Sequence, residues 1–257
     1  MTVSYAASPV GSSMRITLQL SNPMKKNTID LMLNCDLHIH TDYSRDGESS
    51  VEDIIARAVK TGLDVIAITD HDTIEGALKA VEYAREYYPE LLVIPGIEIS
   101  TKQGHLLALG ITEAIPPKID FEETVKTARE KGAFLILPHP FHQWRHGAAL
   151  KVKDAIRIVD AVESFNSRYI FGTANKKAER KAAYFNKTCV GGSDAHNAKF
   201  VGYGRTIIDA EKNQESVFSA IKEGNVEIMG KMTPIRSYTR QSFRNTRKKI
   251  IRRVYRR

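Results

Sequence analysis

Short apolar runs that favour β-strands alternate along this chain with amphipathic patterns that favour α-helices, and this alternation constrains the fold most. The strand-like runs are Leu31–Ile39, Asp64–Thr69, Leu91–Ile99, His105–Ile111, Ala133–Pro138, Asp160–Phe165, Cys189–Ser193 and Val226–Met229. The helical patterns are Val51–Thr61, Thr73–Tyr88, Phe121–Lys131, Thr173–Asn186 and Glu215–Glu223. This order predicts an α/β protein with a mostly parallel sheet covered by helices. About seven or eight such units in roughly 200 residues favour a closed barrel over an open sheet.

The composition is that of a folded domain without a membrane span. The 257 residues are 42% hydrophobic and 26% charged. We expect one domain over residues 31–233, between an N-terminal arm over 1–30 and a C-terminal tail over 234–257. No apolar run approaches the ~20 residues that cross a bilayer, and no secretory signal is evident. Cys35 and Cys189 match no disulfide or zinc pattern, so we expect a cytoplasmic protein with reduced thiols.

The net charge of +8 is concentrated at the C-terminus. Eleven of the 38 Lys and Arg residues lie between Lys231 and Arg257, where no Asp or Glu occurs, so the rest of the chain has 27 basic and 30 acidic side chains. Phe243, Ile250 and Val254 would share one face of a helical tail. The pattern slightly favours contact between this tail and nucleic-acid phosphates. The tail could instead be simply solvated, or could contact an anionic membrane surface.

Histidines and carboxylates recur where the predicted strands end. Strand alternation would place Asp36, His38 and His40 on one face, with Leu37 and Ile39 on the other. Further members follow or open later strands: Asp70, His71, Asp72, Glu98, His105, His139, Asp194 and His196. In barrel enzymes, polar residues at the carboxyl ends of parallel strands form the active-site face. A set of imidazoles and carboxylates without cysteine suits zinc, manganese or iron.

These motifs resemble the PHP (polymerase and histidinol phosphatase) metallophosphoesterase superfamily. The resemblance rests on DLHIHTDYSRDG, TDHDT, GIEIS, a following His, an HP pair and GGSDAH, and it runs from Asn34 to Thr233. It implies a distorted (β/α)7 TIM-like barrel that binds up to three divalent metal ions.

The resemblance also implies the metal ligands. The expected ligands are His38, His40, Glu98 and Asp194 for the first ion, Glu98, His105 and His139 for the second, and Asp46, His71 and His196 for the third. All of these residues except His105 are also expected to be catalytic. Three divalent ions and three carboxylates would leave a charge of about +3, which favours a phosphate ester.

The implied reaction is hydrolysis of a phosphate ester by a metal-bridging hydroxide. Asp46 in the third set favours nucleotides or nucleic-acid ends as substrates over a small molecule such as histidinol phosphate. Two different functions also fit part of the pattern: a nucleic-acid-binding protein with a structural metal site, and an enzyme that hydrolyses C–N bonds.

Further polar residues are expected to border the site. The candidate substrate-binding residues are Arg145, Asn166 and Arg205, with Arg168 and Lys199 as further candidates. A guanidinium can bind phosphate oxygens in a bidentate fork. Each charged side chain could instead occupy a solvated surface position. Asp36 and Asp70 would either orient imidazole N–H groups or form caps and turns.

Overall fold

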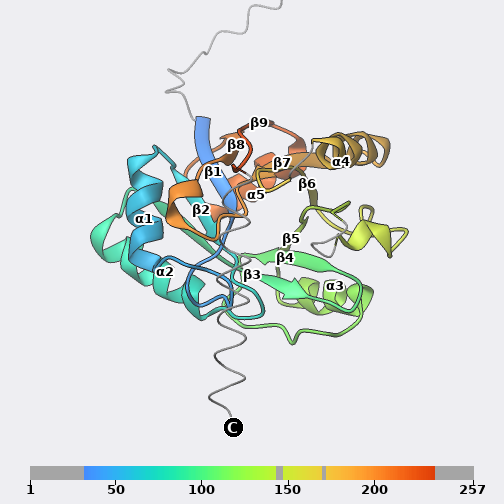
Figure 1. Cartoon of the computed structure of the whole chain (residues 1–257), viewed down its shortest axis with the longest axis horizontal. Coiled ribbons are helices and arrows are strands. Elements are labelled where there is room, and N and C mark those ends of the chain that lie inside the picture. Colours follow the sequence, from blue (N-terminus) through green and yellow to red (C-terminus); the bar gives the residue numbers. More distant parts are fainter. Residues whose placement is uncertain (1–31, 143–146, 170–171, 235–257) are drawn as a thin grey trace, which may run out of the picture.

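The computed structural model describes residues 32–142, 147–169 and 172–234 (Figure 1). Its strands are β1 (Met32–Ile39), β2 (Val65–Ile68), β3 (Leu92–Ser100), β4 (His105–Leu109), β5 (Phe134–Leu137), β6 (Ala161–Asn166), β7 (Thr188–Gly192), β8 (Gly204–Asp209) and β9 (Val226–Gly230). Its helices are α1 (Val51–Lys60), α2 (Glu75–Tyr87), α3 (Phe121–Glu130), α4 (Thr173–Tyr184) and α5 (Gln214–Glu223), with short 3-10 turns η2 (Ala148–Leu150) and η3 (Ala198–Phe200). The N-terminal arm and all but the first residue of the basic tail lie outside the described residues.

The strands form one sheet in the order β7-β6-β5-β4-β3-β2-β1-β8-β9, which curves into a nearly closed barrel (Figure 1). The expected α/β barrel is therefore confirmed. The sheet is less parallel than the alternation predicted, because β1–β8, β3–β4, β4–β5 and β8–β9 are antiparallel pairs. Only residues 101–104 connect β3 to β4, which is too short for the crossover that a parallel pair needs.

The two sides of the barrel opening meet where β7 approaches β8. The Gly191 N–H donates to Thr206 Oγ1 at 2.9 Å, and the Thr206 hydroxyl donates to the Gly191 carbonyl at 3.0 Å. Beyond β7, the His40 N–H donates to the Ala195 carbonyl at 2.8 Å. The end of β1 is thus held against the residues that follow β7, although the two strands lie far apart in sheet order.

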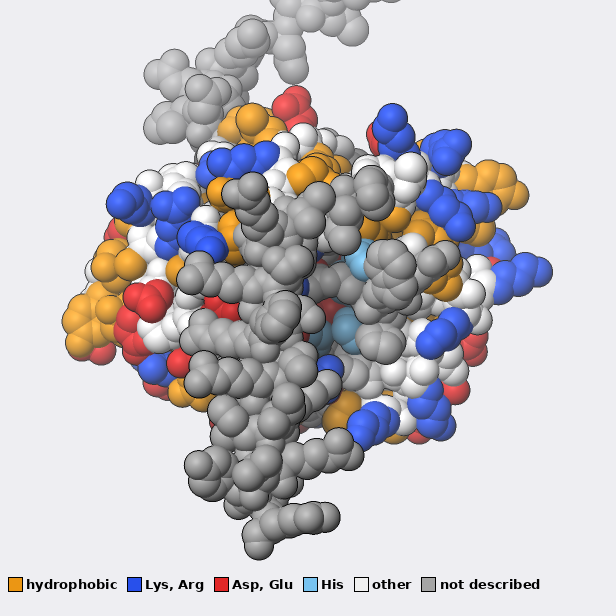
Figure 2. Space-filling view, viewed as in Figure 1, with side chains coloured by type: hydrophobic (Ala, Val, Ile, Leu, Met, Phe, Trp, Pro, Cys, Tyr) orange, Lys and Arg blue, Asp and Glu red, His pale blue; other side chains and the backbone are white. Residues whose placement is uncertain are grey.

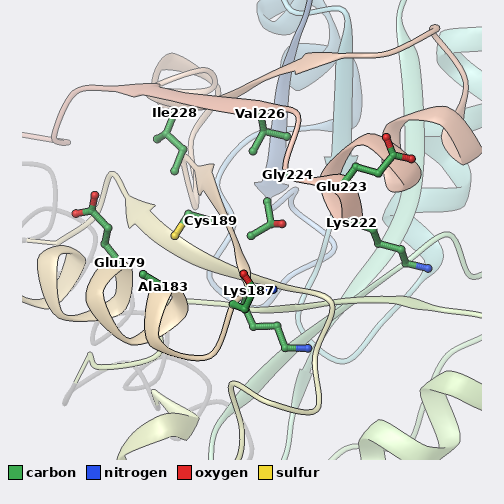
Figure 3. Close-up of a pocket in the computed structure, with 11 residues that line it drawn as sticks. Glu179, Ala183, Lys187, Cys189, Lys222, Glu223, Gly224, Val226 and Ile228 are labelled. Carbon is green, nitrogen blue, oxygen red and sulfur yellow. The ribbon is translucent and has the colours of Figure 1, made fainter. Parts of the chain in front are cut away.

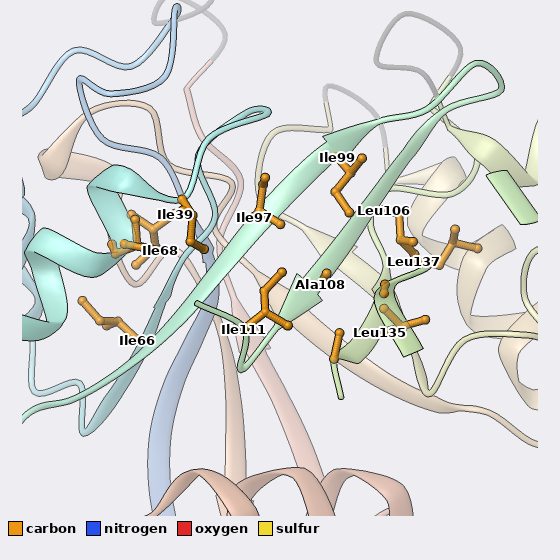
Figure 4. Close-up of a cluster of buried hydrophobic side chains, with 14 of the residues drawn as sticks. Ile39, Ile66, Ile68, Ile97, Ile99, Leu106, Ala108, Ile111, Leu135 and Leu137 are labelled. Carbon is orange, nitrogen blue, oxygen red and sulfur yellow. The ribbon is translucent and has the colours of Figure 1, made fainter. Parts of the chain in front are cut away.

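Alternate residues of the strands pack into two separate apolar clusters. One cluster contains Ile66, Ile68, Ile97 and Leu106 with the buried faces of α1 to α4 (Figure 4). The other contains the alternating residues of the same strands together with α5: Leu33, Cys35, Val65, Ala67, Leu107, Leu109, Val217, Ala220 and Ile221. Because both faces of the strands are buried, the strands read as nearly continuous apolar runs in the sequence.

Strand β8 is the element that the sequence pattern did not predict. It pairs antiparallel with β1 and β9 along Gly204–Asp209. Its only strongly apolar residues are Ile207 and Ile208, a run too short to indicate a strand in the sequence. Within the described residues, every helix is too short or too polar to cross a membrane.

Candidate metal centre

The fold brings the expected ligands to one end of the barrel. His38 and His40 lie at the end of β1, His71 follows β2, Glu98 lies near the end of β3, and His139 follows β5. The antiparallel strand β4 contributes its first residue instead of its last. Its His105 pairs with Ser100, the last residue of β3, so a ligand that opens β4 reaches the same end. Asp194 and His196 follow β7, and Asp46 lies between β1 and α1.

An irregularity in β1 changes the alternation that the sequence predicted. The pairing of β1 with β2 shifts between Asp36 and Ile39, and Leu37 and Ile39 consequently pack in different apolar clusters. His38 and His40 still face the same site, since each Nε2 lies close to Glu98 Oε2. Strict alternation was therefore wrong for the apolar pair and right for the two histidines.

The carboxylate of Glu98 lies at the centre of the cluster. Its Oε1 is 2.7 Å from His105 Nδ1 and 3.0 Å from His139 Nε2. Its Oε2 is 3.3 Å from His38 Nε2 and 3.2 Å from His40 Nε2. The Glu98 side chain is 1% exposed, so its carboxylate has been removed from water. Glu98 thus contacts four of the imidazoles that were expected to share it.

Asp194 and Asp46 flank the other side of the cluster. Asp194 Oδ1 is 3.6 Å from His40 Nε2 and 3.3 Å from His196 Nδ1, and Asp46 Oδ2 is 3.2 Å from His196 Nε2. The Asp46 side chain is 24% exposed, more than any of the groups it faces here. Histidine side chains are visible at the surface of this face of the molecule (Figure 2).

The potential ligand atoms form four overlapping groups of three, and within each group the three atoms lie within 4.8 Å of one another. They are His38–His40–Asp194, His38–Glu98–His139, His71–Glu98–His105 and His40–His71–His196. Eight of the nine expected ligands belong to these groups, and Asp46 adjoins them through His196. The structure therefore brings together every side chain of the expected ligand sets.

Glu163 in β6 is a buried carboxylate of this site that the sequence analysis missed. The His38 Nδ1–H donates to Glu163 Oε1 at 2.9 Å, and the His139 backbone N–H donates to Glu163 Oε2 at 2.8 Å. A hydrogen bond from one imidazole nitrogen to a carboxylate orients the ring, so that the other nitrogen faces the site. The available signal was one acidic residue inside an otherwise apolar strand, in the same strand as Asn166.

Asn166 lies where the sequence predicted, at the site end of β6. A shift in the β6–β7 register between Glu163 and Phe165 places Asn166 on the same side as Glu163. Its Nδ2 donates to Glu163 Oε2 at 2.9 Å and to Asp194 Oδ2 at 3.1 Å. The amide therefore connects two carboxylates of the cluster.

The charged substrate-binding candidates differ in position. Arg168 is 8% exposed, and its Nη1 donates to Asp194 Oδ1 at 3.2 Å and contacts the His196 ring. Arg205 Nε donates to the Gly202 carbonyl, and Lys199 Nζ lies over the Phe200 ring. Among the contacts of the described residues, those of Arg205 and Lys199 do not join them to the cluster. Arg145 lies outside the described residues.

Asp36 and Asp70 contact main-chain and hydroxyl groups instead of imidazoles. Asp36 accepts from the N–H groups of Ser193 and Gly202 at 3.0 and 2.8 Å, while Asp70 accepts from the N–H and hydroxyl of Thr41, both at 2.7 Å. In the described residues these contacts match a cap or turn-forming role. Each fixes the backbone of a loop that carries ligands.

The electrostatics of the cluster suit a bound cation. Burial lowers the pKa of His196, and the charges of Arg168 and His40 lower it further, to about 4. Burial alone would raise the pKa of Glu98, but the surrounding imidazoles hold it well below its usual range. Neutral imidazole at His196 and an ionised carboxylate at Glu98 are lone-pair donors at neutral pH. This donor set fits zinc, manganese or iron.

A separate cleft lies beside the beginning of β7, whereas the histidines follow its end. It has a volume of about 540 Å³ and opens between α4, α5, β7 and β9 (Figure 3). Its lining includes Glu179, Lys187, Cys189 and Lys222, and contains none of the clustered histidines. The cleft is therefore distinct from the candidate metal centre.

A barrel with imidazoles and carboxylates gathered at one end defines a class of potential metal-binding α/β proteins. Comparison of sequences identifies the family within that class. The PHP domain model matches residues 36–188 and the PHP-associated model matches residues 172–226. This chain belongs to the PHP domain family.

The chain is also similar to individual proteins of other organisms. An uncharacterized protein of Methanocaldococcus jannaschii is 35% identical over 159 residues, which are 58% of this chain and 91% of that protein. A 5'-3' exoribonuclease of Haemophilus influenzae is 38% identical over 102 residues, covering 38% of this chain and only 36% of the exoribonuclease. A two-domain Bacteroides vulgatus protein that contains a predicted PHP-like metal-dependent phosphoesterase shares the fold, with a TM-score of 0.65 and 21% identity over 86% of this chain and 70% of that one.

Proposed function

We propose that this protein is a metal-dependent hydrolase of phosphate esters, and that its substrates are nucleotides or nucleic-acid ends. The observation that carries the proposal is Glu98, buried among His38, His40, His105 and His139. The similarity to an exoribonuclease and to a PHP-like phosphoesterase fold supports the reaction class.

The proposed ligand sets are those that the resemblance to the PHP family implies. His38, His40, Glu98 and Asp194 would hold one ion, and Glu98, His105 and His139 a second. Asp46, His71 and His196 would hold a third. When bound, divalent cations would neutralise charge on the phosphate and make water a stronger acid.

The chain's own residues have three tasks in this proposal. Glu163 and Asn166 orient His38 and Asp194 through the hydrogen bonds described above. Arg168, beside Asp194, would bind a phosphate oxygen through its guanidinium. Burial of the ligands keeps competing water away from the carboxylates, which strengthens every charge interaction in the site.

The experiment is phosphate release from a panel of esters with added Mn²⁺. The panel contains histidinol phosphate, mononucleotides, 3′,5′-bisphosphates and 5′-phosphorylated oligonucleotides. We expect metal-dependent release that is fastest with a nucleotide or oligonucleotide and absent in His38→Ala. Fastest release from histidinol phosphate would reject the proposed substrate class. No release from any ester by a folded, metal-loaded protein would reject the proposed activity.

A further inference from the structure

The exposed face of α4 combines basic and aromatic side chains in a row that starts beside the candidate metal centre. Asn175, in the first half of α4, accepts a hydrogen bond from the Asn166 N–H at 3.2 Å. Lys177 Nζ lies 4.5 Å from the centre of the Phe141 ring, and Phe141 is two residues after His139. The site end of α4 is therefore fixed next to the proposed ligands.

The row continues along one side of the helix. Lys177, Lys181 and Tyr184 are spaced by four and three residues, which places them on the same helical face. All three are exposed, Tyr184 at 77%, and Lys181 Nζ lies 5.4 Å from the Tyr184 ring centre. With a rise of 1.5 Å per residue, the row is about 10 Å long, the length of roughly three stacked nucleotides.

Neighbouring residues extend the positive surface. Lys176 and Arg180 are exposed on the same helix, and Arg157 lies over the ring of Phe185, the residue after α4. Residues 151–187 contain nine basic and four acidic residues, whereas residues 1–150 contain 14 basic and 20 acidic residues. Figure 2 shows Lys and Arg side chains on the side of the molecule that carries α4, and a further group on the opposite side. The segment that contains α4 is therefore more basic than the part of the chain that precedes it.

We propose that the α4 face, defined by Lys177, Arg180, Lys181 and Tyr184, binds the chain of a single-stranded polynucleotide whose end enters the candidate metal centre. The proposal rests on the proposed function, and adds that the substrate is a polymer. Positive side chains contact the phosphates, and an exposed aromatic ring offers a stacking platform for a base. A membrane surface fits less well, because Tyr184 is the single large apolar side chain exposed on this helix.

The test is fluorescence anisotropy of a labelled, 5′-phosphorylated single-stranded 12-mer with the full-length protein in EDTA, which prevents turnover. The test variant is Lys177→Gln/Arg180→Gln/Lys181→Gln. The matched control, Lys60→Gln/Arg85→Gln/Lys126→Gln, removes the same charge from exposed positions on α1, α2 and α3. Both variants keep the C-terminal tail, so any contribution of the tail cancels.

We expect the α4 variant to bind about tenfold more weakly. The slope of log K against the logarithm of salt concentration should be smaller in magnitude by about two, because three phosphate contacts are lost. Tyr184→Ala should weaken binding by roughly fivefold or more with an unchanged salt slope. Equal losses in the α4 and control variants would overturn the proposal. The proposal would also be overturned if the α4 variant bound phosphatidylserine-containing vesicles more weakly than wild type but bound the oligonucleotide equally well.

Hydrolysis of a small chromogenic phosphate separates this proposal from the proposed function. The α4 variant should keep wild-type kcat/KM for the small ester, because the three substituted side chains are exposed and none is a proposed metal ligand. A loss there would assign the helix to the metal centre itself and reject the surface. If neither the wild-type protein nor the variants hydrolyse any ester, the proposed function fails. The anisotropy comparison still decides whether α4 binds the polynucleotide.

Discussion

His38 Nδ1 and Glu163 Oε1, 125 residues apart in the sequence, lie 2.9 Å from each other in the interior of the barrel. The pair connects β1 to β6, which are the first and sixth strands along the chain. Burial lowers the pKa of His38, but the charges of Glu163, Asp194 and Glu98 raise it well above its usual value. The carboxylate of Glu163 therefore fixes the orientation of an imidazole whose other nitrogen faces Glu98.

Replacement of Glu163 should weaken metal binding without removing a proposed ligand. Glu163→Gln cannot accept from His38, His139 and Asn166 together, because half of its side-chain amide is a donor. Loss of such a supporting carboxylate costs about 10- to 100-fold in metal affinity. Mn²⁺ titration by isothermal calorimetry measures this, with the exposed Glu123→Gln as control. Wild-type affinity in a folded Glu163→Gln protein would contradict the orienting role.

A side chain at Gly192 should disturb the same pair. A Cβ there would lie 2.3 Å from Glu163 Oε1 and 2.8 Å from His38 Cβ. Overpacking of this kind costs about 1–3 kcal/mol, so we expect Gly192→Ala to unfold roughly 5 °C below wild type. Gly172→Ala is the matched control, because nothing lies within 4 Å of its Cβ. Equal melting temperatures for the two variants in calorimetry would show that the site relaxes freely.

Metal removal should destabilise the protein. A ligand present at 100 times its Kd adds about 2.7 kcal/mol to the free energy of unfolding, which is about 5 to 10 °C in Tm for a chain of this size. Dialysis against EDTA should lower Tm by that amount, and Mn²⁺ or Zn²⁺ should restore it. Glu98→Ala should show no such response, because it lacks the carboxylate at the centre of the cluster. A metal-dependent Tm in Glu98→Ala would indicate binding elsewhere.

Removal of the basic tail should leave the metal centre intact if the cut is placed after Pro234. Thr233 is buried, and its N–H donates to the Ser167 carbonyl at 2.7 Å. A chain ending at Pro234 keeps that contact and should hydrolyse a small chromogenic phosphate at the wild-type rate. A chain ending at Met232 loses it and should unfold at lower temperature. Loss of activity in the chain that ends at Pro234 would make the tail part of the folded domain.

The sequence allowed prediction of local features whose cause is local. In the described part of the chain, apolar runs and helical patterns predicted each α-helix and all strands but β8, since burial of both sheet faces leaves a continuous apolar signature. The positions of His38, Glu98 and His196 were predictable because functional groups at barrel strand ends follow apolar runs directly. The resemblance to the PHP family then supplied an expected grouping of these residues.

Contacts between distant segments could not be read in that way. Glu163 resembled any acidic residue in a strand until β6 was placed opposite β1. Asp36 accepts from the N–H groups of Ser193 and Gly202, which lie 157 and 166 residues further along the chain, so the neighbouring sequence could not indicate these partners. The exposure of α4 likewise depends on which face of the helix the barrel covers.

By itself, then, the sequence determined the class of fold, the order of its elements and the set of side chains able to bind metal, because periodicity and residue chemistry are properties of short segments. Tertiary structure decided which imidazole faces which carboxylate, that Glu163 joins them, and that a basic helix begins beside them. Those relationships depend on register, strand direction and barrel closure, which arise only when residues more than a hundred positions apart pack together.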